Sequence, residues 1–284
     1  MKIAAVMATR GNPRRAAAVI ECANALSSGK HEIEWILCFD KDDTETGKLF
    51  VDNYYDTIRL VRGDAPIGVG GVWNRGAALT NADIIAPFPD DSFPGLPDWD
   101  ATICDQLHDP SRIGVIAWND TANPDQCTLP VITRRWYELC GLYDDRFPFW
   151  FYDTCVSEMW SFVTGRPVGI PKHLLLAAKK GKTKSMRELP FWWGFYVFTR
   201  QERLEKAAQV RKALGIDIAP DLLNHVLENW THRDAMASKH FDAMEKAMSA
   251  AEGDPPQRYL TAKANALRIM GYPATRQEWL EACA

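Results

Sequence analysis

The stretch Ala82-Asp83-Ile84-Ile85-Ala86-Pro87-Phe88-Pro89-Asp90-Asp91-Ser92 decides the fold expected for this chain. A short apolar run between turn residues predicts a buried strand, here residues 83–88. In an open α/β sheet, ligands bind beyond the carboxyl ends of such strands. Two adjacent carboxylates on the following turn repel each other unless a cation or hydrogen-bond donors neutralise them, so Asp90 and Asp91 predict a divalent metal held together with substrate phosphates. A turn that caps the next helix is the alternative.

Strands and helices alternate in the sequence before this stretch. Strands are expected at 3–8, 34–39 and 57–61, and helices at about 16–26, 46–54 and 73–80. This βαβαβ order predicts a mostly parallel sheet with right-handed crossovers. The glycine run at 68–76 does not have the spacing of a dinucleotide-binding fingerprint and follows the third strand, which argues against a dehydrogenase.

The chain after Asp91 continues the pattern and then becomes helical. Strands are expected at 113–118, 130–133 and 173–176, with helices at about 97–107, before Gly141 and at 152–163. A capping-box signature, Thr199-Arg200-Gln201-Glu202, then opens a run of helices at 204–214, 220–230, 235–251 and 258–270. The sequence therefore predicts an α/β domain over residues 1–198, with a central sheet flanked by helices, and a helical extension over 199–284.

Composition limits the class of protein. Of 284 residues, 46% are hydrophobic and 25% charged, which is ordinary for a globular protein. The formal net charge of −4 gives no global reason to expect nucleic acid or an anionic membrane as partner. Seven scattered cysteines without a Cys-x-x-Cys pair indicate reduced thiols and a cytoplasmic protein. No stretch approaches the ~20 apolar residues of a membrane span.

The order of several motifs resembles the nucleotide-sugar half of a GT-A glycosyltransferase, similar to family 2. The resemblance covers roughly residues 1–165 and is carried by Thr9-Arg10-Gly11-Asn12-Pro13, the acids Asp40-Lys41-Asp42-Asp43, Trp73-Asn74-Arg75-Gly76-Ala77-Ala78, Pro89-Asp90-Asp91-Ser92 and Gly95-Leu96-Pro97-Asp98-Trp99. It implies the GT-A fold and transfer of a sugar from a nucleotide-sugar donor to an acceptor hydroxyl, with a UDP-sugar as the first candidate for the donor.

The same resemblance implies roles for individual residues. Asp91 aligns with the acid that binds the divalent ion, Mn²⁺ or Mg²⁺, beneath the sugar diphosphate. Pro89 stands where many members have a first acid, which is a departure from the family pattern. An acid after the second strand would hold the nucleobase, with Asp40, Asp42 and Asp43 as candidates. The remaining donor-binding residues implied are Thr9, Arg10, Asn74 and Asp90.

Asp153 is the candidate catalytic base, because the family carries its Asp or Glu at the start of the corresponding helix. It would take the proton of the acceptor hydroxyl in an inverting transfer, with Asp144, Asp145 and Glu158 in reserve. Neighbouring aromatic residues, Trp150 among them, suggest a sugar platform. The resemblance also makes His173 a candidate second metal ligand. Structural alternatives for these residues are a helix cap for Asp153 and a packing role for His173.

The acceptor and three rival functions stay open at this level. The basic run from Lys179 to Arg187 could contact a diphosphate or an anionic acceptor through Lys182 and Lys184, and is otherwise a solvated loop. Acceptors to consider are a glycan, a small molecule and a modified (hydroxymethylated) DNA base. A nucleotidyltransferase and a non-catalytic sugar-nucleotide-binding protein are the other rivals. Neither the sugar nor the oligomeric state follows from the sequence.

Overall fold

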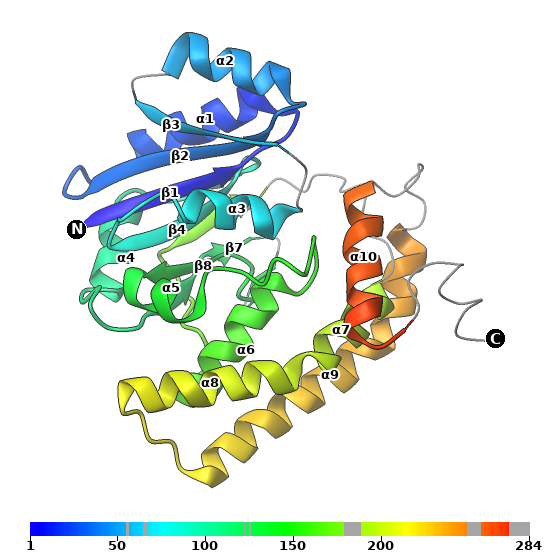
Figure 1. Cartoon of the computed structure of the whole chain (residues 1–284). Coiled ribbons are helices and arrows are strands. Elements are labelled where there is room, and N and C mark those ends of the chain that lie inside the picture. The colour runs from blue at the N-terminus through cyan, green and yellow to red at the C-terminus, as the bar shows by residue number, and fades with distance from the viewer. Residues whose placement is uncertain are drawn as a thin grey trace. The chain divides into compact units, whose positions relative to one another are not determined.

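The computed structural model of this protein describes residues 1–54, 57–64, 68–121, 123–124, 126–178, 189–248 and 257–272. The chain divides into two compact units. Unit 1 comprises Met1–Tyr143 and Pro167–Gly181, and unit 2 comprises Asp144–Arg166 and Lys182–Ala284. Figure 1 traces the elements of both along the chain.

A six-stranded sheet forms the centre of unit 1, in the order β3-β2-β1-β4-β8-β6. The pairs β1–β2, β1–β4 and β2–β3 are parallel, whereas β8 runs antiparallel to both β4 and β6. The mostly parallel sheet expected from the sequence is confirmed, and its inner strands are apolar and buried over most of their length. The strands are β1 (Lys2–Ala8), β2 (Glu32–Asp40), β3 (Ile58–Gly63), β4 (Ile84–Pro89), β6 (Val115–Ala117) and β8 (Pro130–Thr133).

Helices and a smaller sheet complete unit 1. Helix α3 packs closely on β1 and β2, since a β-carbon added at Gly76 would lie 2.4 Å from Val6 Cγ1. The three-stranded sheet has the order β5-β9-β7 and follows the Asp90–Asp91 turn directly through β5. The helices are α1 (Pro13–Ala25), α2 (Thr44–Tyr54), α3 (Val69–Ala77), α4 (Trp99–Gln106) and α5 (Arg134–Cys140), and the short strands are β5 (Ser92–Pro94), β7 (Asn119–Asp120) and β9 (Leu175–Ala178).

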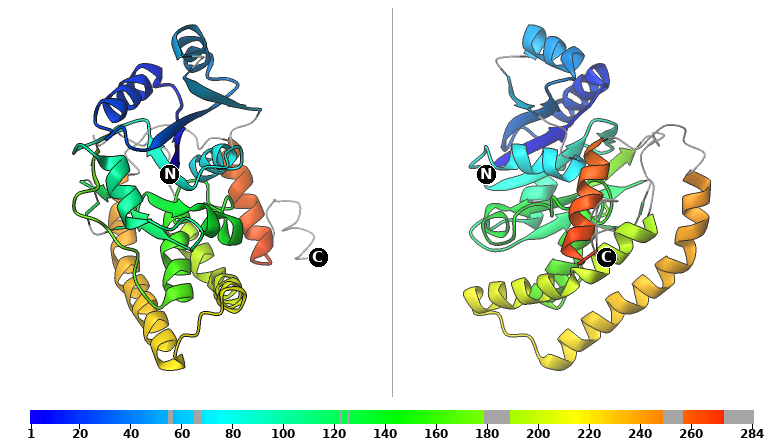
Figure 2. Two further views of the ribbon diagram at one scale, coloured as in Figure 1. Left: turned by 90° about the vertical axis from the view of Figure 1, so that its left-hand side faces the viewer. Right: turned by 45° about the vertical axis from the view of Figure 1, so that its right-hand side comes forward.

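The described part of unit 2 is helical. An aromatic core of Phe147, Trp192, Phe195 and Tyr196 is fully buried within it. The views in Figure 2 show α9 as one long helix. The helices are α6 (Tyr152–Thr164), α7 (Leu189–Phe198), α8 (Arg200–Leu214), α9 (Pro220–Met248) and α10 (Gln257–Ile269).

Three expectations about elements in the second half of the chain were wrong. The helices expected at 220–230 and 235–251 are one helix, α9, because no Gly or Pro interrupts residues 231–234. Thr199 does not cap α8 with its side chain, since its hydroxyl donates to the Phe195 carbonyl at 2.9 Å. The last strand begins at Leu175, so His173 lies in the turn before β9.

The division into units gives residues 144–166 and α7 to the same unit as the C-terminal helices. An α/β catalytic domain over 1–198 stays a prediction.

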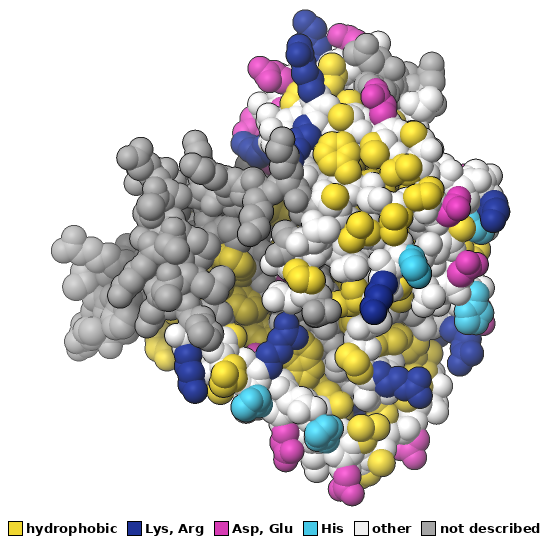
Figure 3. Space-filling view, turned by 180° about the vertical axis from the view of Figure 1, so that it is seen from behind, with side chains coloured by type: hydrophobic (Ala, Val, Ile, Leu, Met, Phe, Trp, Pro, Cys, Tyr) yellow, Lys and Arg dark blue, Asp and Glu magenta, His cyan; other side chains and the backbone are white. Residues whose placement is uncertain are grey.

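Within the described residues, no helix combines the length and apolar character needed to cross a bilayer. On the face drawn in Figure 3, Lys and Arg side chains are interspersed with Asp and Glu, so the residues coloured there form no extended basic surface for a nucleic-acid backbone.

Candidate functional site

The carboxyl ends of β1 and β4 meet through Thr9 and Asp90. The two strands are parallel neighbours, with Ala8 paired to Pro89, so the residues that follow them are also adjacent. The buried Thr9 hydroxyl donates to Asp90 Oδ2 at 2.7 Å. Burial raises the pKa of Asp90, and the Thr9 hydrogen bond opposes that rise. Both residues were expected at this edge, and the structure brings them into contact.

Arg10 connects the same edge to the end of β2. Its Nη1 donates to Asp40 Oδ2 at 2.7 Å, and its Nη2 donates to Asp42 Oδ2 at 2.5 Å. Asp40 is buried, whereas Arg10 and Asp42 are exposed. Asp43 has a structural role, because its Oδ2 accepts from the Gly11 backbone N–H at 2.8 Å and from the Thr46 hydroxyl. Of the three acids considered for the nucleobase, Asp40 and Asp42 therefore face the Arg10 side chain.

Arg75 also lies beside Asp40 at this edge, and it was not among the residues predicted for the site. Its Nη1 lies 3.6 Å from Asp40 Oδ1, an oxygen that accepts no hydrogen bond within the described part of the chain. The guanidinium crosses over Gly63 at the end of β3, where an added β-carbon would lie 1.6 Å from Nη1. The glycine is the signal that was overlooked, since a side chain at position 63 would block the Arg75 guanidinium.

Asp91 lies partly exposed on the turn between β4 and β5. The Ser92 hydroxyl donates to its Oδ1 at 3.2 Å, and Arg15 of α1 donates to its backbone carbonyl at 3.2 Å. No group of three His, Cys, Asp or Glu residues suited to a metal occurs among the described residues. A single accessible carboxylate fits a hard divalent ion whose other ligands are phosphate oxygens and water, as Mg²⁺ sites often are.

Two residues expected at the donor site lie elsewhere or serve the fold. Asn74 is bound through both ends of its amide to the Tyr143 backbone, at 2.9 Å and 3.0 Å. His173 is exposed before β9, and the antiparallel register that pairs Ser92 with Ala178 places it at the far end of that strand from Asp91. The structure does not bring His173 to Asp91.

In unit 2, Asp153 is the second residue of α6 and is partly buried. The Thr154 backbone N–H donates to its Oδ1 at 2.7 Å. Burial raises its pKa to about 6, and the hydrogen bonds from Thr154 oppose the rise, with a smaller contribution from the charge of Arg233 on α9. An Asp with this pKa at a helix start is partly deprotonated near neutral pH, which suits proton transfer.

The reserve acids have other partners or lie in the open. Glu158 is fully buried and bound by Arg200 and Arg203 of α8. Asp144 is bound by Arg146 through a two-pronged contact, and Asp145 is exposed. Among these acids, Asp153 therefore combines partial burial with the absence of an arginine ion pair within the described residues, whereas Asp145 lies in solvent.

The aromatic and basic candidates have different outcomes. Trp150 packs against the aromatic core of unit 2, and its buried Nε1 has no hydrogen-bond partner within the described residues. Lys182 and Lys184 lie outside the described residues.

No protein-family model and no curated protein matches this sequence. Solved structures do match. The mannosyltransferase PcManGT from Pyrobaculum calidifontis, in complex with GDP-Man and Mn²⁺, is similar at a TM-score of 0.54 and 15% identity, over 98% of this chain and 82% of that one. S. aureus TarS 1-349 is similar at a TM-score of 0.57 and 10% identity, over 96% of this chain and 83% of that one. The same TarS fragment in complex with UDP is similar at a TM-score of 0.56 and 11% identity, over 96% of this chain and 83% of that one. The GT-A fold expected from the sequence is confirmed.

Proposed function

We propose that this protein is a glycosyltransferase that moves a sugar from a nucleotide-sugar donor, a UDP-sugar, to an acceptor hydroxyl with inversion. The observation that carries the proposal is the meeting of Thr9, Arg10, Asp40 and the Asp90–Asp91 turn at one edge of the unit 1 sheet. The GT-A fold of the chain and the GDP-Man and UDP held by its structural neighbours support the same conclusion.

The nucleobase is proposed to bind at Asp40. Arg10 and Arg75 flank its carboxylate, at 2.7 Å and 3.6 Å, so a donor, an acceptor and a donor stand side by side, with Asp40 Oδ1 and Arg75 Nη1 buried. Uracil presents the complementary order along its imide edge, with O2 and O4 as acceptors and N3–H as donor. Cytosine lacks the central donor, and guanine has a donor where uracil has its second acceptor. This pattern favours UDP over CDP and GDP.

A divalent ion, Mn²⁺ or Mg²⁺, would be held by Asp91 together with the donor's diphosphate oxygens, and would neutralise charge on the leaving diphosphate. Asp153 takes the proton of the acceptor hydroxyl while that oxygen attacks the anomeric carbon. The nucleoside diphosphate leaves from the opposite face. A positioned base contributes a factor of about 10²–10⁴ to the rate.

The test is release of UDP from UDP-sugars by the purified chain, with Mn²⁺ or with EDTA. We expect metal-dependent release that Asp91→Ala abolishes, and retained donor binding with turnover lower by about 10²–10⁴ in Asp153→Asn. Asp52→Asn, a change at an exposed carboxylate of α2, is the control and should leave the rate unchanged. UDP release at the same rate with EDTA and in Asp91→Ala would refute the proposal. Formation of pyrophosphate from a nucleoside triphosphate would favour a nucleotidyltransferase.

A further inference from the structure

Phe151, the residue immediately before α6, has a left-handed backbone conformation with φ of 66° and ψ of −5°. A β-carbon disfavours this region, and a bulky aromatic residue in it is rare. Such a residue persists only where its surroundings hold it, and these conformations concentrate at functional sites. The Phe151 carbonyl accepts a helical hydrogen bond from the Cys155 N–H at 2.8 Å. The conformation of Phe151 therefore sets the direction in which α6 begins.

Tyr196 of α7 holds the Phe151 ring in place. The two rings stack with their centroids 5.1 Å apart and their planes 17° apart. Tyr196 is fully buried, and the guanidinium of Arg203 lies 4.4 Å from its ring centroid. Arg203 Nη2 also donates to the Tyr196 carbonyl oxygen at 2.7 Å. Arg203 thus holds Tyr196, the residue that supports Phe151, through both its backbone carbonyl and its ring.

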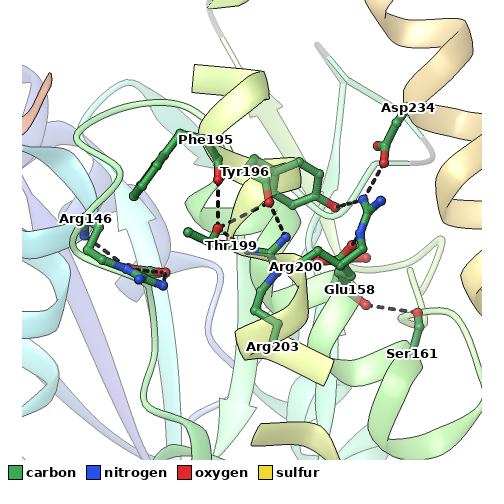
Figure 4. Close-up of polar contacts among 11 residues, drawn as sticks. Arg146, Glu158, Ser161, Phe195, Tyr196, Thr199, Arg200, Arg203 and Asp234 are labelled. Carbon is green, nitrogen blue, oxygen red and sulfur yellow. Dashed lines mark hydrogen bonds and ion pairs between the residues drawn. The ribbon is translucent and has the colours of Figure 1, made fainter. Parts of the chain in front are cut away.

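Glu158 connects this support back to α6 (Figure 4). Its carboxylate is fully buried and accepts from Arg203 Nε and, at 2.5 Å, from Arg200 Nε. Glu158 lies five residues after Asp153 on the same helix. The chain of contacts runs from Glu158 on α6 through Arg203 and Tyr196 to Phe151, the residue immediately before α6. It holds the helix both at its first turn and at its second.

We propose that Phe151 and Tyr196 are positioning residues for Asp153, because their stacked rings fix the start of α6 and with it the direction of the Asp153 carboxylate. This inference rests on the proposed role of Asp153 as the base. The carboxylate sits on the second residue of the helix, and its Oδ1 is already bound by the Thr154 N–H at 2.7 Å. A shift of about 1 Å in such a group costs about 10²-fold in rate.

Phe151→Gly removes the aromatic ring but allows the backbone to keep its conformation, because glycine adopts the left-handed region readily. We expect this variant to fold and to lower kcat by about 10–100-fold, with the donor KM within about twofold of wild type. Phe151→Tyr keeps the stacked ring and should restore the rate. The matched control is Asp98→Gly, since Asp98 is the other non-glycine residue with positive φ, 59°, in the described part of the chain and precedes α4. Asp98→Gly should leave kcat unchanged.

A second readout does not depend on turnover. Titration of ¹³C-labelled aspartate carboxyls by NMR reports the Asp153 pKa, raised to about 6 by burial and opposed by Arg233 of α9. The side chains beside it, Tyr152 and Cys155, also have pKa values raised by burial and stay neutral near pH 6. In Phe151→Gly the Asp153 value should fall toward the ordinary value of about 4 as water reaches the carboxyl. Phe151→Tyr and Asp98→Gly should leave it unchanged.

The inference is overturned if Phe151→Gly keeps both the wild-type kcat and the wild-type Asp153 pKa. Failure of the proposed function has a different signature. If wild-type protein transfers no sugar, the assignment of Asp153 as a base fails. The NMR titration still decides then whether the Phe151–Tyr196 stack holds the carboxyl.

Discussion

At the scale of single residues, burial raises the pKa of two of the candidate site carboxylates, Asp90 in unit 1 and Asp153 in unit 2. In unit 1, Asp90 is held by the Thr9 hydroxyl at 2.7 Å, which opposes the rise. In unit 2, burial raises the pKa of Asp153 to about 6. Two carboxylates in one protein can have different chemical roles when their surroundings give them different pKa values. Here the proposed tasks are donor binding for Asp90 and proton transfer for Asp153.

Asp153→Asn should stabilise the protein at pH 8 while it lowers turnover. The folded pKa near 6 lies above the unfolded value of about 4. The stabilising contribution of the protonated form is therefore complete below about pH 4 and is lost as the pH rises through 6. Asparagine imitates the protonated form, so the gain at pH 8 should be about 1–2 kcal/mol after a discount for partial exposure.

Urea denaturation of wild type and Asp153→Asn at pH 8 measures this difference in the free energy of unfolding. Equal stability of wild type and Asp153→Asn at pH 8 would mean that the carboxyl is solvated and its pKa ordinary.

Arg75→Met should reduce the preference for UDP over CDP by about tenfold, since a hydrogen bond to a charged group is worth about 1.5–3 kcal/mol. Gly63→Ala should act in the same direction while keeping every arginine, because the new β-carbon would displace the Arg75 guanidinium. Calorimetric titration with each nucleotide provides the measurement. Arg59→Met, at an exposed arginine near the other end of β3, is the control. An unchanged UDP preference in both test variants would remove Arg75 from the site.

At the scale of elements, α6 carries both the proposed base and the acid that holds the helix in place. Asp153 lies on its first turn, and Glu158 binds two arginines of α8 while fully buried. Arg200 also binds Asp234 of α9. Three helices of unit 2 therefore meet at one buried ionic cluster, and the start of α6 depends on it.

Glu158→Ala should lower the free energy of unfolding by about 3–5 kcal/mol, because it leaves buried arginine charge without its partner. Glu202→Ala is the matched control, since Glu202 also pairs with an arginine, Arg146, but is about half exposed. Its loss should cost at most about 1 kcal/mol. Chemical denaturation of both variants tests this. A similar small loss in the two would show that the buried cluster contributes little.

Two glycines in helices should respond to alanine with opposite signs. In α3, a β-carbon at Gly76 would lie 2.4 Å from Val6 Cγ1 and 2.6 Å from Cys38 Sγ, so Gly76→Ala should destabilise by about 1–3 kcal/mol. In α7, a β-carbon at Gly194 meets nothing within 4 Å, so Gly194→Ala should stabilise by about 0.5–1 kcal/mol. Thermal unfolding of both variants checks the contrast. Destabilisation by Gly194→Ala would contradict the packing described for α7.

The sequence predicts the elements of unit 1 well because each of its inner strands is a short apolar run closed by turn residues. It misses α7, since Leu189–Phe198 is apolar on all sides and shows no helical periodicity. Asp90 and Thr9 were predictable because parallel neighbours end at the same edge. The misplacement of His173 has a different cause. Its distance from Asp91 depends on the register between β5 and β9, which no local pattern reveals.

At the scale of the whole molecule, the chain is organised as two units that do not follow the sequence in one piece. Residues 144–166 join the C-terminal helices, where Glu158 binds arginines more than 40 positions later in the chain. Contacts between residues so far apart are invisible to a reading by local pattern. Asp91 and Asp153 consequently belong to different units, and each proposed role needs its own variant.

The most direct test of the account is calorimetric titration of UDP into wild type and Asp91→Asn, each with and without Mn²⁺. The account predicts that Mn²⁺ tightens UDP binding to wild type by at least about tenfold, and that Asp91→Asn loses this increment while it keeps the weak metal-free binding. UDP affinity that is the same with and without Mn²⁺, or an increment that Asp91→Asn retains in full, would contradict it.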